Sequence, residues 1–131
     1  MYALSKRSEN NLIGVHPDLQ KVVRLAITLT PIDFGISEGL RLEKRQEGLF
    51  ARGKSTTMDS NHLVQHDGFG HAVDMFVLPD GSISWEAEDF RQVIQAFFEA
   101  ATQLHIQIKS GGLFRSFQDS PHIELNRKYY D

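Results

Sequence analysis

The stretch SNHLVQHDGFGHAVDMFV, residues 60–77, combines three histidines with an apolar run that carries one carboxylate. Its continuation HAVDMFVL, residues 71–78, has the β-branched and aromatic content of a strand, and a Pro-Asp-Gly turn follows it. Because side chains alternate between faces along a strand, Asp74 shares a face with Phe76 and lies opposite His71. The pattern predicts that this face is buried, so Asp74 needs a cation or hydrogen-bond donors.

The segments around this strand predict an α+β domain. Helical spacing of apolar residues, strand-like alternation and Pro or Gly breaks give the element boundaries. The predicted elements are a helix between Pro17 and Pro31, a strand over 33–40, a helix over 42–52, a long loop over 53–70, the strand over 71–78, a helix over 85–104, and strands over 105–112 and 120–125.

Length and composition limit the classes of protein that this chain can represent. Its 131 residues suit a single domain over 1–131, and a net charge of −3 gives no indication of nucleic-acid binding. There is no cysteine, so a metal would be held by nitrogen and oxygen. We find no signal-like apolar segment at the N-terminus and no run long enough to span a membrane. We therefore expect a soluble protein made in the cytoplasm.

The histidines favour a metal site over a purely structural Asp74. A buried aspartate is often satisfied by backbone amides or an arginine, and a single histidine is usually a surface or hydrogen-bonded residue. Here, however, His122 also begins an apolar-alternating segment, and two imidazoles with one carboxylate form a common catalytic zinc shell that leaves a position for water. Alternation makes His71 the weakest candidate. Spacing does not choose between His62 and His66, which both lie in the loop.

Two further residues are candidates for catalysis. Asp119 precedes His122 by three residues, and the intervening proline lets it lie beside a metal, where it could accept a proton from bound water. It could instead form a turn with its own backbone. Arg41 follows a predicted strand and suits a substrate carboxylate or an oxyanion. Its alternative is a surface ion pair with Glu38 or Glu43.

Taken together, these motifs resemble the peptidoglycan-cutting zinc peptidases of the VanY/D-Ala-D-Ala carboxypeptidase group. The resemblance covers nearly the whole chain and is strongest to the phage endolysin branch with L-alanyl-D-glutamate endopeptidase activity. The segments that carry it are SENNLIGVHPDLQKVVRLAI, DFGISEGLR with Arg45-Gln46 after it, ARGKSTTMDSNH, GHAVDM and GGLFRSFQDSPHIEL. They contain the family pattern of Ser-x-His, Gly-x-Ala-x-Asp and Asp-x-Pro-His. The fold that this implies is a small antiparallel sheet with helices packed on one side, as in hedgehog and D-Ala-D-Ala peptidase domains.

The resemblance also implies roles for individual residues. It assigns His62, Asp74 and His122 as ligands of a zinc ion (Zn²⁺), Asp119 as the catalytic carboxylate, Arg41 as the residue that binds substrate or stabilises the transition state, and Ser55 and Ser60 as substrate-binding residues near the site. The chain departs from the common pattern by an inserted LVQHDGF after His62, which keeps His66 open as a ligand. It also has Leu113-Phe114 where the family often has Asp-Trp, which could change the cleft wall.

The implied function is lysis of a host cell by a phage endolysin. Its partner would be bacterial peptidoglycan, with no nucleic acid and no stable membrane insertion. We expect a monomer without a separate wall-binding domain, which accumulates in the host cytoplasm and reaches the periplasm and wall through a holin. The alternatives are a bacterial D,D-carboxypeptidase or dipeptidase of the same family and a non-catalytic zinc-binding recognition domain.

Overall fold

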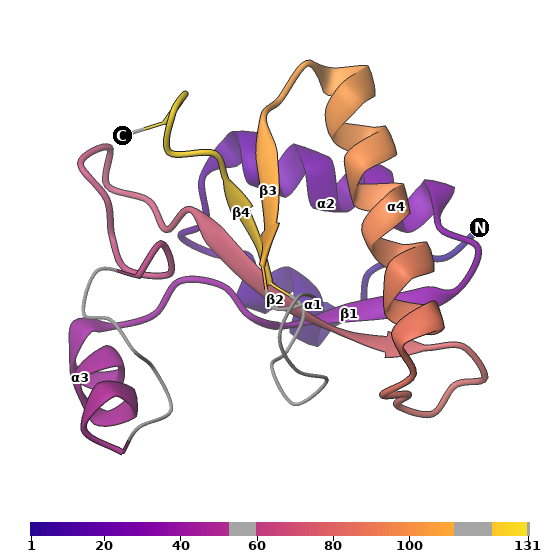
Figure 1. Ribbon diagram of the computed structural model, residues 1–131, viewed down its shortest axis with the longest axis horizontal. Helices are drawn as coiled ribbons and strands as arrows, with labels where there is room; N and C mark the ends of the chain where they lie inside the picture. Colours follow the sequence, from indigo (N-terminus) through magenta and orange to yellow (C-terminus); the bar gives the residue numbers. More distant parts are fainter. Residues whose placement is uncertain (53–59, 112–121, 131) are drawn as a thin grey trace.

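The computed structural model describes residues 1–52, 60–111 and 122–130, which include a four-stranded antiparallel sheet (Figure 1). The strand order is β1-β2-β4-β3, and every neighbouring pair is antiparallel. The strands are β1 (Asp33–Glu38), β2 (Ala72–Leu78), β3 (Ile108–Gly111) and β4 (His122–Leu125). The predicted α+β class with a small antiparallel sheet is confirmed.

Two helices, α2 (Pro17–Leu29) and α4 (Ala87–Leu104), pack against each other and cover one face of this sheet (Figure 1). Their apolar stripes recur at helical spacing and are buried. Phe97 of α4 meets Phe34 of β1 with ring centroids 5.1 Å apart. None of the helices in the described part of the chain combines the length and apolar character that crossing a membrane requires.

The sheet therefore has a core face, which packs against α2 and α4, and an opposite face that these two helices do not cover, here called the open face; β2 contributes to both. Val73, Met75 and Val77 are almost fully buried in the core. Asp74 and Phe76 point to the opposite face and are only partly buried. The expectation that Asp74 lies on the buried face of its strand is thus wrong, because the helices cover the face made by the odd-numbered residues. A carboxylate is tolerated in this strand because it points away from the apolar core and has polar partners on the other face.

A short helix that the sequence did not predict, α1 (Lys6–Asn11), lies against β1. Ser5 caps its N-terminus by accepting the N–H of Ser8. The Ser8 hydroxyl in turn accepts the N–H of Ile36 at 3.0 Å, and the Asn11 amide donates to the Ile36 carbonyl at 2.7 Å. These bonds occupy the edge of β1 that has no strand beside it. Its six residues are all polar and carry no apolar periodicity, so this helix left no signal in the sequence.

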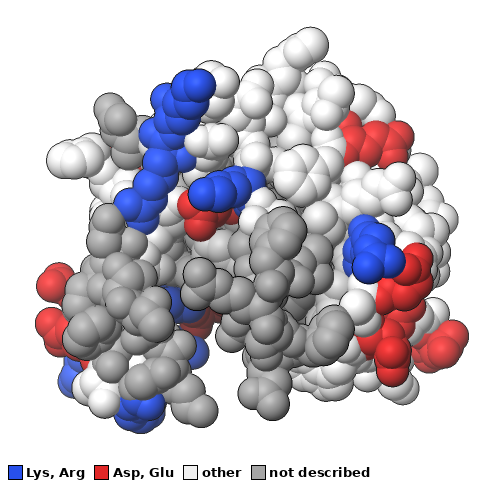
Figure 2. Space-filling model, in the orientation of Figure 1, with Lys and Arg blue, Asp and Glu red and all other residues white. Residues whose placement is uncertain are grey.

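The remaining differences between prediction and structure concern element ends. Helix α3 (Glu43–Ala51) begins and ends within a residue of its predicted bounds. The predicted strand over 105–112 is wrong for 105–107, because His105 adopts a left-handed conformation with φ 58° and caps α4. Its N–H and that of Ile106 bond back to the last turn of the helix. On the face drawn in Figure 2, basic and acidic side chains stand in small separate groups, some of one sign and some mixed.

Close packing at Gly39 joins α1 to the segment after β1. A Cβ atom at Gly39 would lie 2.0 Å from the Asn11 carbonyl oxygen and 2.8 Å from Val15. We predict that Gly39→Ala lowers the free energy of unfolding by about 2 kcal/mol or more, because backbone must shift to admit the methyl group. Urea unfolding of the metal-free protein measures this.

The matched control is Gly48→Ala in α3, where the nearest atom to the new methyl group is the end of the Arg52 side chain at 3.7 Å. Alanine is favoured over glycine inside a helix by about 0.5–1 kcal/mol, so this variant should be as stable as the parent or slightly more so. Equal stability of Gly39→Ala and the parent would contradict the close approach at Gly39.

Candidate active site

Three predicted ligands come together on the open face of the sheet. His62 Nε2 and His122 Nδ1 each lie 3.1 Å from the same Asp74 oxygen, Oδ1. The two imidazole rings are 5.0 Å apart, centroid to centroid. Asp74 and His122 are direct partners in the β2–β4 register, so the sheet itself places them side by side. His62 reaches them from the loop that precedes β2.

Backbone contacts fix the position of His62. Its Nδ1–H donates to the Gly39 carbonyl at 2.7 Å, and its own carbonyl accepts the N–H of Arg41 at 2.7 Å. The Ser60 hydroxyl accepts the His62 N–H at 3.1 Å. The side chain of His62 is only 3% exposed. His62 is therefore attached to the segment after β1 through both its ring and its backbone.

In His62 and His122, the ring nitrogen that does not face Asp74 has its own hydrogen-bond partner. That partner determines whether the nitrogen facing Asp74 carries a proton or a lone pair. A carbonyl oxygen can only accept, so the contact to Gly39 puts the proton of neutral His62 on Nδ1. The second nitrogen of His122, Nε2, lies 2.7 Å from Glu124 Oε1 and donates to that carboxylate. His62 Nε2 and His122 Nδ1 are then both acceptors, aimed at an oxygen that also only accepts. Extra protons or a cation must lie between them.

The pKa shifts have the same physical origin. Burial alone raises the pKa of the Asp74 carboxyl, but hydrogen bonds from His122 and His62 outweigh burial and hold it well below its ordinary value. Burial lowers the pKa of His122, yet the bonds to Asp74 and Glu124 dominate and raise it to about 9. The cluster therefore favours positive charge strongly. Binding of a metal ion would satisfy this demand by displacing the protons.

Arg41 lies beside this cluster. Its Nη2 is 3.7 Å from Asp74 Oδ2, and its side chain is 11% exposed. Its Nε–H donates to Glu38 Oε1 at 2.6 Å, and Glu38 is the register partner of Asp74 in β1–β2. The other oxygen of Glu38 accepts from Arg45 Nε at 2.7 Å. The ion pair considered from the sequence is thus present, and it holds Arg41 next to Asp74 instead of out on the surface.

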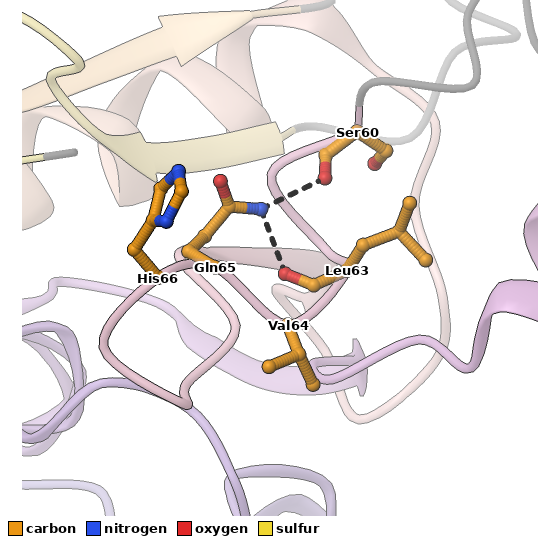
Figure 3. Close-up of a pocket in the computed structure, with 5 residues that line it drawn as sticks. All are labelled: Ser60, Leu63, Val64, Gln65 and His66. Carbon is orange, nitrogen blue, oxygen red and sulfur yellow. Dashed lines mark hydrogen bonds between the residues drawn. The ribbon is translucent and has the colours of Figure 1, made fainter.

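His66 lies away from this cluster. It is exposed and lines a shallow cavity of about 350 Å³ together with Ser60, Leu63, Val64 and Gln65. Figure 3 shows these five side chains, with the Gln65 amide donating to the carbonyls of Ser60 and Leu63. It is His62, not His66, that contacts Asp74. Two other predicted site residues, Ser55 and Asp119, lie outside the described residues.

A second group of His16, Asp67 and His71 has a similar composition but the opposite hydrogen-bond polarity. His16 Nδ1 accepts the N–H of Asp18 at the start of α2, so its proton lies on Nε2, which is directed at Asp67 from 3.5 Å. His71 Nε2 lies 2.7 Å from the same carboxylate. Here donors converge on an acceptor, so no cation is needed. As expected from strand alternation, His71 does not contact Asp74.

This second group fastens the loop to the body of the domain. The Tyr130 ring meets those of His16 and His71 edge-on, and its hydroxyl donates to Asp18 at 2.8 Å. We predict that Asp67→Ala lowers the free energy of unfolding by about 1 kcal/mol, because it removes the acceptor for both imidazoles. Asp67→Asn keeps an oxygen acceptor and should retain most of the stability. Urea unfolding compares the two, and an unchanged midpoint for Asp67→Ala would exclude this role.

The sequence analysis missed the groups that orient the imidazoles. Glu124 could have been found, because it is two residues from His122 in a strand and so shares its face. The carbonyl of Gly39 could not, since any residue supplies a carbonyl and the contact is set by chain folding. Asn61, which donates to Glu124 at 2.8 Å, also gave no signal beyond its place beside His62.

Comparisons with known proteins identify the family of this chain. Residues 1–131 match the family described as phage L-alanyl-D-glutamate peptidase. The L-alanyl-D-glutamate peptidase of Escherichia phage T5 is 34% identical over 134 residues, covering 99% of this chain and 93% of the phage protein. The crystal structure of the Serratia marcescens L-Ala D-Glu endopeptidase ChiX has a TM-score of 0.83 and 40% identity, with 95% of this chain and 90% of that chain covered. The chain belongs to the phage L-alanyl-D-glutamate peptidase family.

Proposed function

We propose that this peptidase holds a zinc ion with His62, Asp74 and His122 and hydrolyses the L-alanyl-D-glutamate bond of peptidoglycan stem peptides. The observation that carries the metal assignment is the polarity of the cluster. Two imidazole lone pairs converge on a carboxylate oxygen because Gly39 and Glu124 occupy the other ring nitrogens. A donor set of two histidines and one carboxylate is that of hydrolytic zinc enzymes, and the chain has no thiol to offer instead.

The chemistry of the reaction is divided between the ion and the protein. Bound zinc would lower the pKa of a water molecule and polarise the scissile carbonyl. We assign Asp119 the task of taking a proton from the attacking water and passing it to the leaving amine. Arg41 would bind a substrate carboxylate or the oxyanion from its position beside Asp74, with its guanidinium oriented by Glu38. Ser55 and Ser60 are proposed to bind the substrate near the ion.

The proposed biological role is that of a phage endolysin. Family membership and the peptidase activity for which the relatives are named support peptidoglycan as the partner. We further propose that the chain acts as a monomer of one domain over residues 1–131, accumulates in the host cytoplasm and reaches the wall through a holin. No part of this role requires nucleic acid or insertion into a membrane.

Digestion of purified peptidoglycan tests the bond that is cut. The expected products carry new C-terminal L-alanine and new N-terminal D-glutamate, identified by mass spectrometry and end-group analysis. Release of free D-alanine would instead identify a D,D-carboxypeptidase of the same chemistry. Zinc binding without any new termini would indicate a recognition domain and contradict the proposal.

Metal removal provides a second prediction. A chelator should abolish hydrolysis, and added zinc should restore it. Asp74→Ala should bind no stoichiometric zinc, because it removes the oxygen that both imidazoles face. Asp67→Ala should bind one ion per chain as the parent does, since its cluster has the opposite polarity. Metal analysis after gel filtration measures this, and full activity of metal-free protein would rule out the zinc mechanism.

The role of Asp119 gives a third prediction. Asp119→Ala should retain zinc and stability but lose about 10²–10⁴-fold in kcat, the usual contribution of a general base. Asp80→Ala, in the exposed turn after β2, is the control for loss of one carboxylate and should keep parental activity. Turnover on a soluble stem peptide measures both variants. An Asp119→Ala variant with parental kcat would remove Asp119 from the mechanism.

A further inference from the structure

We infer that Glu124, itself oriented by Asn61, is a positioning residue that fixes the His122 ring with Nδ1 toward Asp74. This inference rests on the proposed function, because the ring position matters only if His122 is a ligand. Neither Glu124 nor Asn61, both among the described residues, forms a hydrogen bond with Asp74. Their proposed effect on metal binding therefore acts through His122.

The first part of the argument is the contact between Glu124 and His122. The two residues are on the same face of β4, and Glu124 Oε1 lies 2.7 Å from His122 Nε2. An imidazole attached through two rotatable bonds can otherwise turn either nitrogen toward a metal. A carboxylate at Nε2 selects one ring orientation and one tautomer, and it makes Nδ1 a better electron donor.

The second part is that Glu124 is itself held in place. Asn61 Nδ2 donates to its other oxygen, Oε2, at 2.8 Å. Asn61 is only 3% exposed, and its backbone carbonyl accepts the N–H of His71 at 2.6 Å, so the backbone that carries the side-chain amide is held in place. Each carboxylate oxygen of Glu124 thus has its own partner, which fixes the plane of the carboxylate as well as its position.

The third part concerns the path of this connection. Asn61 is the neighbour of His62 in the loop, whereas Glu124 follows His122 in β4. The Asn61–Glu124 bond therefore ties the two segments that supply the imidazoles, 63 residues apart in the chain. The bond keeps the distance between the two rings constant without occupying a position at the ion. Groups of this kind behind metal ligands typically change metal affinity by 10–100-fold when removed.

The test measures zinc affinity with a competing chelating dye. Glu124→Ala should raise the Kd for zinc by about 10–100-fold. Glu124→Gln should have a smaller effect, because its amide oxygen can still accept from His122 and Asn61 Oδ1, which has no partner among the described residues, can turn to accept from its NH₂ group. Asn61→Ala removes the donor to Glu124 Oε2 and should raise the Kd for zinc, by less than Glu124→Ala does.

The matched control is Glu88→Ala, which removes an exposed glutamate that pairs with Arg91 on α4. It should leave the Kd for zinc unchanged. Long-range ¹H–¹⁵N spectra of the zinc-loaded protein provide a readout that a merely structural role would not move. They should report a protonated Nε2 on His122 in the parent and a loss of that single state in Glu124→Ala.

The outcomes separate this inference from the proposed function. If the parent binds zinc and Glu124→Ala and Glu124→Gln bind it with the parental Kd, the positioning role is wrong and the metal site stands. If the parent binds no zinc, the proposed function fails and the inference fails with it. If Glu124→Ala does not fold, Glu124→Gln and Asn61→Ala still decide, because a parental Kd for zinc in Asn61→Ala contradicts the Asn61–Glu124 link.

Discussion

The structure of the site depends on the direction of two hydrogen bonds that lie behind it. Gly39 accepts from one nitrogen of His62 and Glu124 accepts from one nitrogen of His122, which leaves the remaining lone pairs facing Asp74. The group of His16, Asp67 and His71 has the same residue types at comparable distances, but its histidines act as donors. Composition alone does not distinguish a metal site from a structural hydrogen-bond cluster. The hydrogen bond of the second ring nitrogen distinguishes the two groups at His62, His122 and His16.

The sheet provides the second constraint, because it separates the core from the chemistry at the level of single residues. Val73, Met75 and Val77 enter the core, while Asp74 between them faces the site. Across the strands, Glu38, Asp74 and His122 form one row of register partners. Strand pairing alone thus places the Glu38 carboxylate, which orients Arg41, beside Asp74 and the His122 imidazole. Of the three proposed ligands, only His62 lies in a loop. Backbone hydrogen bonds from Arg41 to His62 and from His71 to Asn61 hold that loop in place.

Much of this could be predicted from the sequence, and the rest failed for identifiable reasons. Alternation correctly separated His71 from Asp74, and the family motif correctly placed His62 rather than His66 beside Asp74. The face of Asp74 was misjudged because both faces of this strand carry apolar side chains. The sequence alone therefore does not reveal which face the helices cover. Helix α1 was missed because six polar residues have no periodicity. Gly39 was missed as a histidine partner because its contribution is a backbone atom, and Asp119 lies outside the described residues.

Gly39 has a consequence that reaches beyond the site. Its α-carbon lies against the Asn11 carbonyl at the end of α1, and its own carbonyl holds His62. A ligand that tightens the position of His62 therefore also favours docking of α1 on the edge of β1, and the coupling must be reciprocal. Cleavage of the first dozen residues by a protease should consequently be slower when an ion occupies the centre. Loss of that N-terminal helix should in turn weaken retention of the ion, although no residue of α1 is among the proposed ligands.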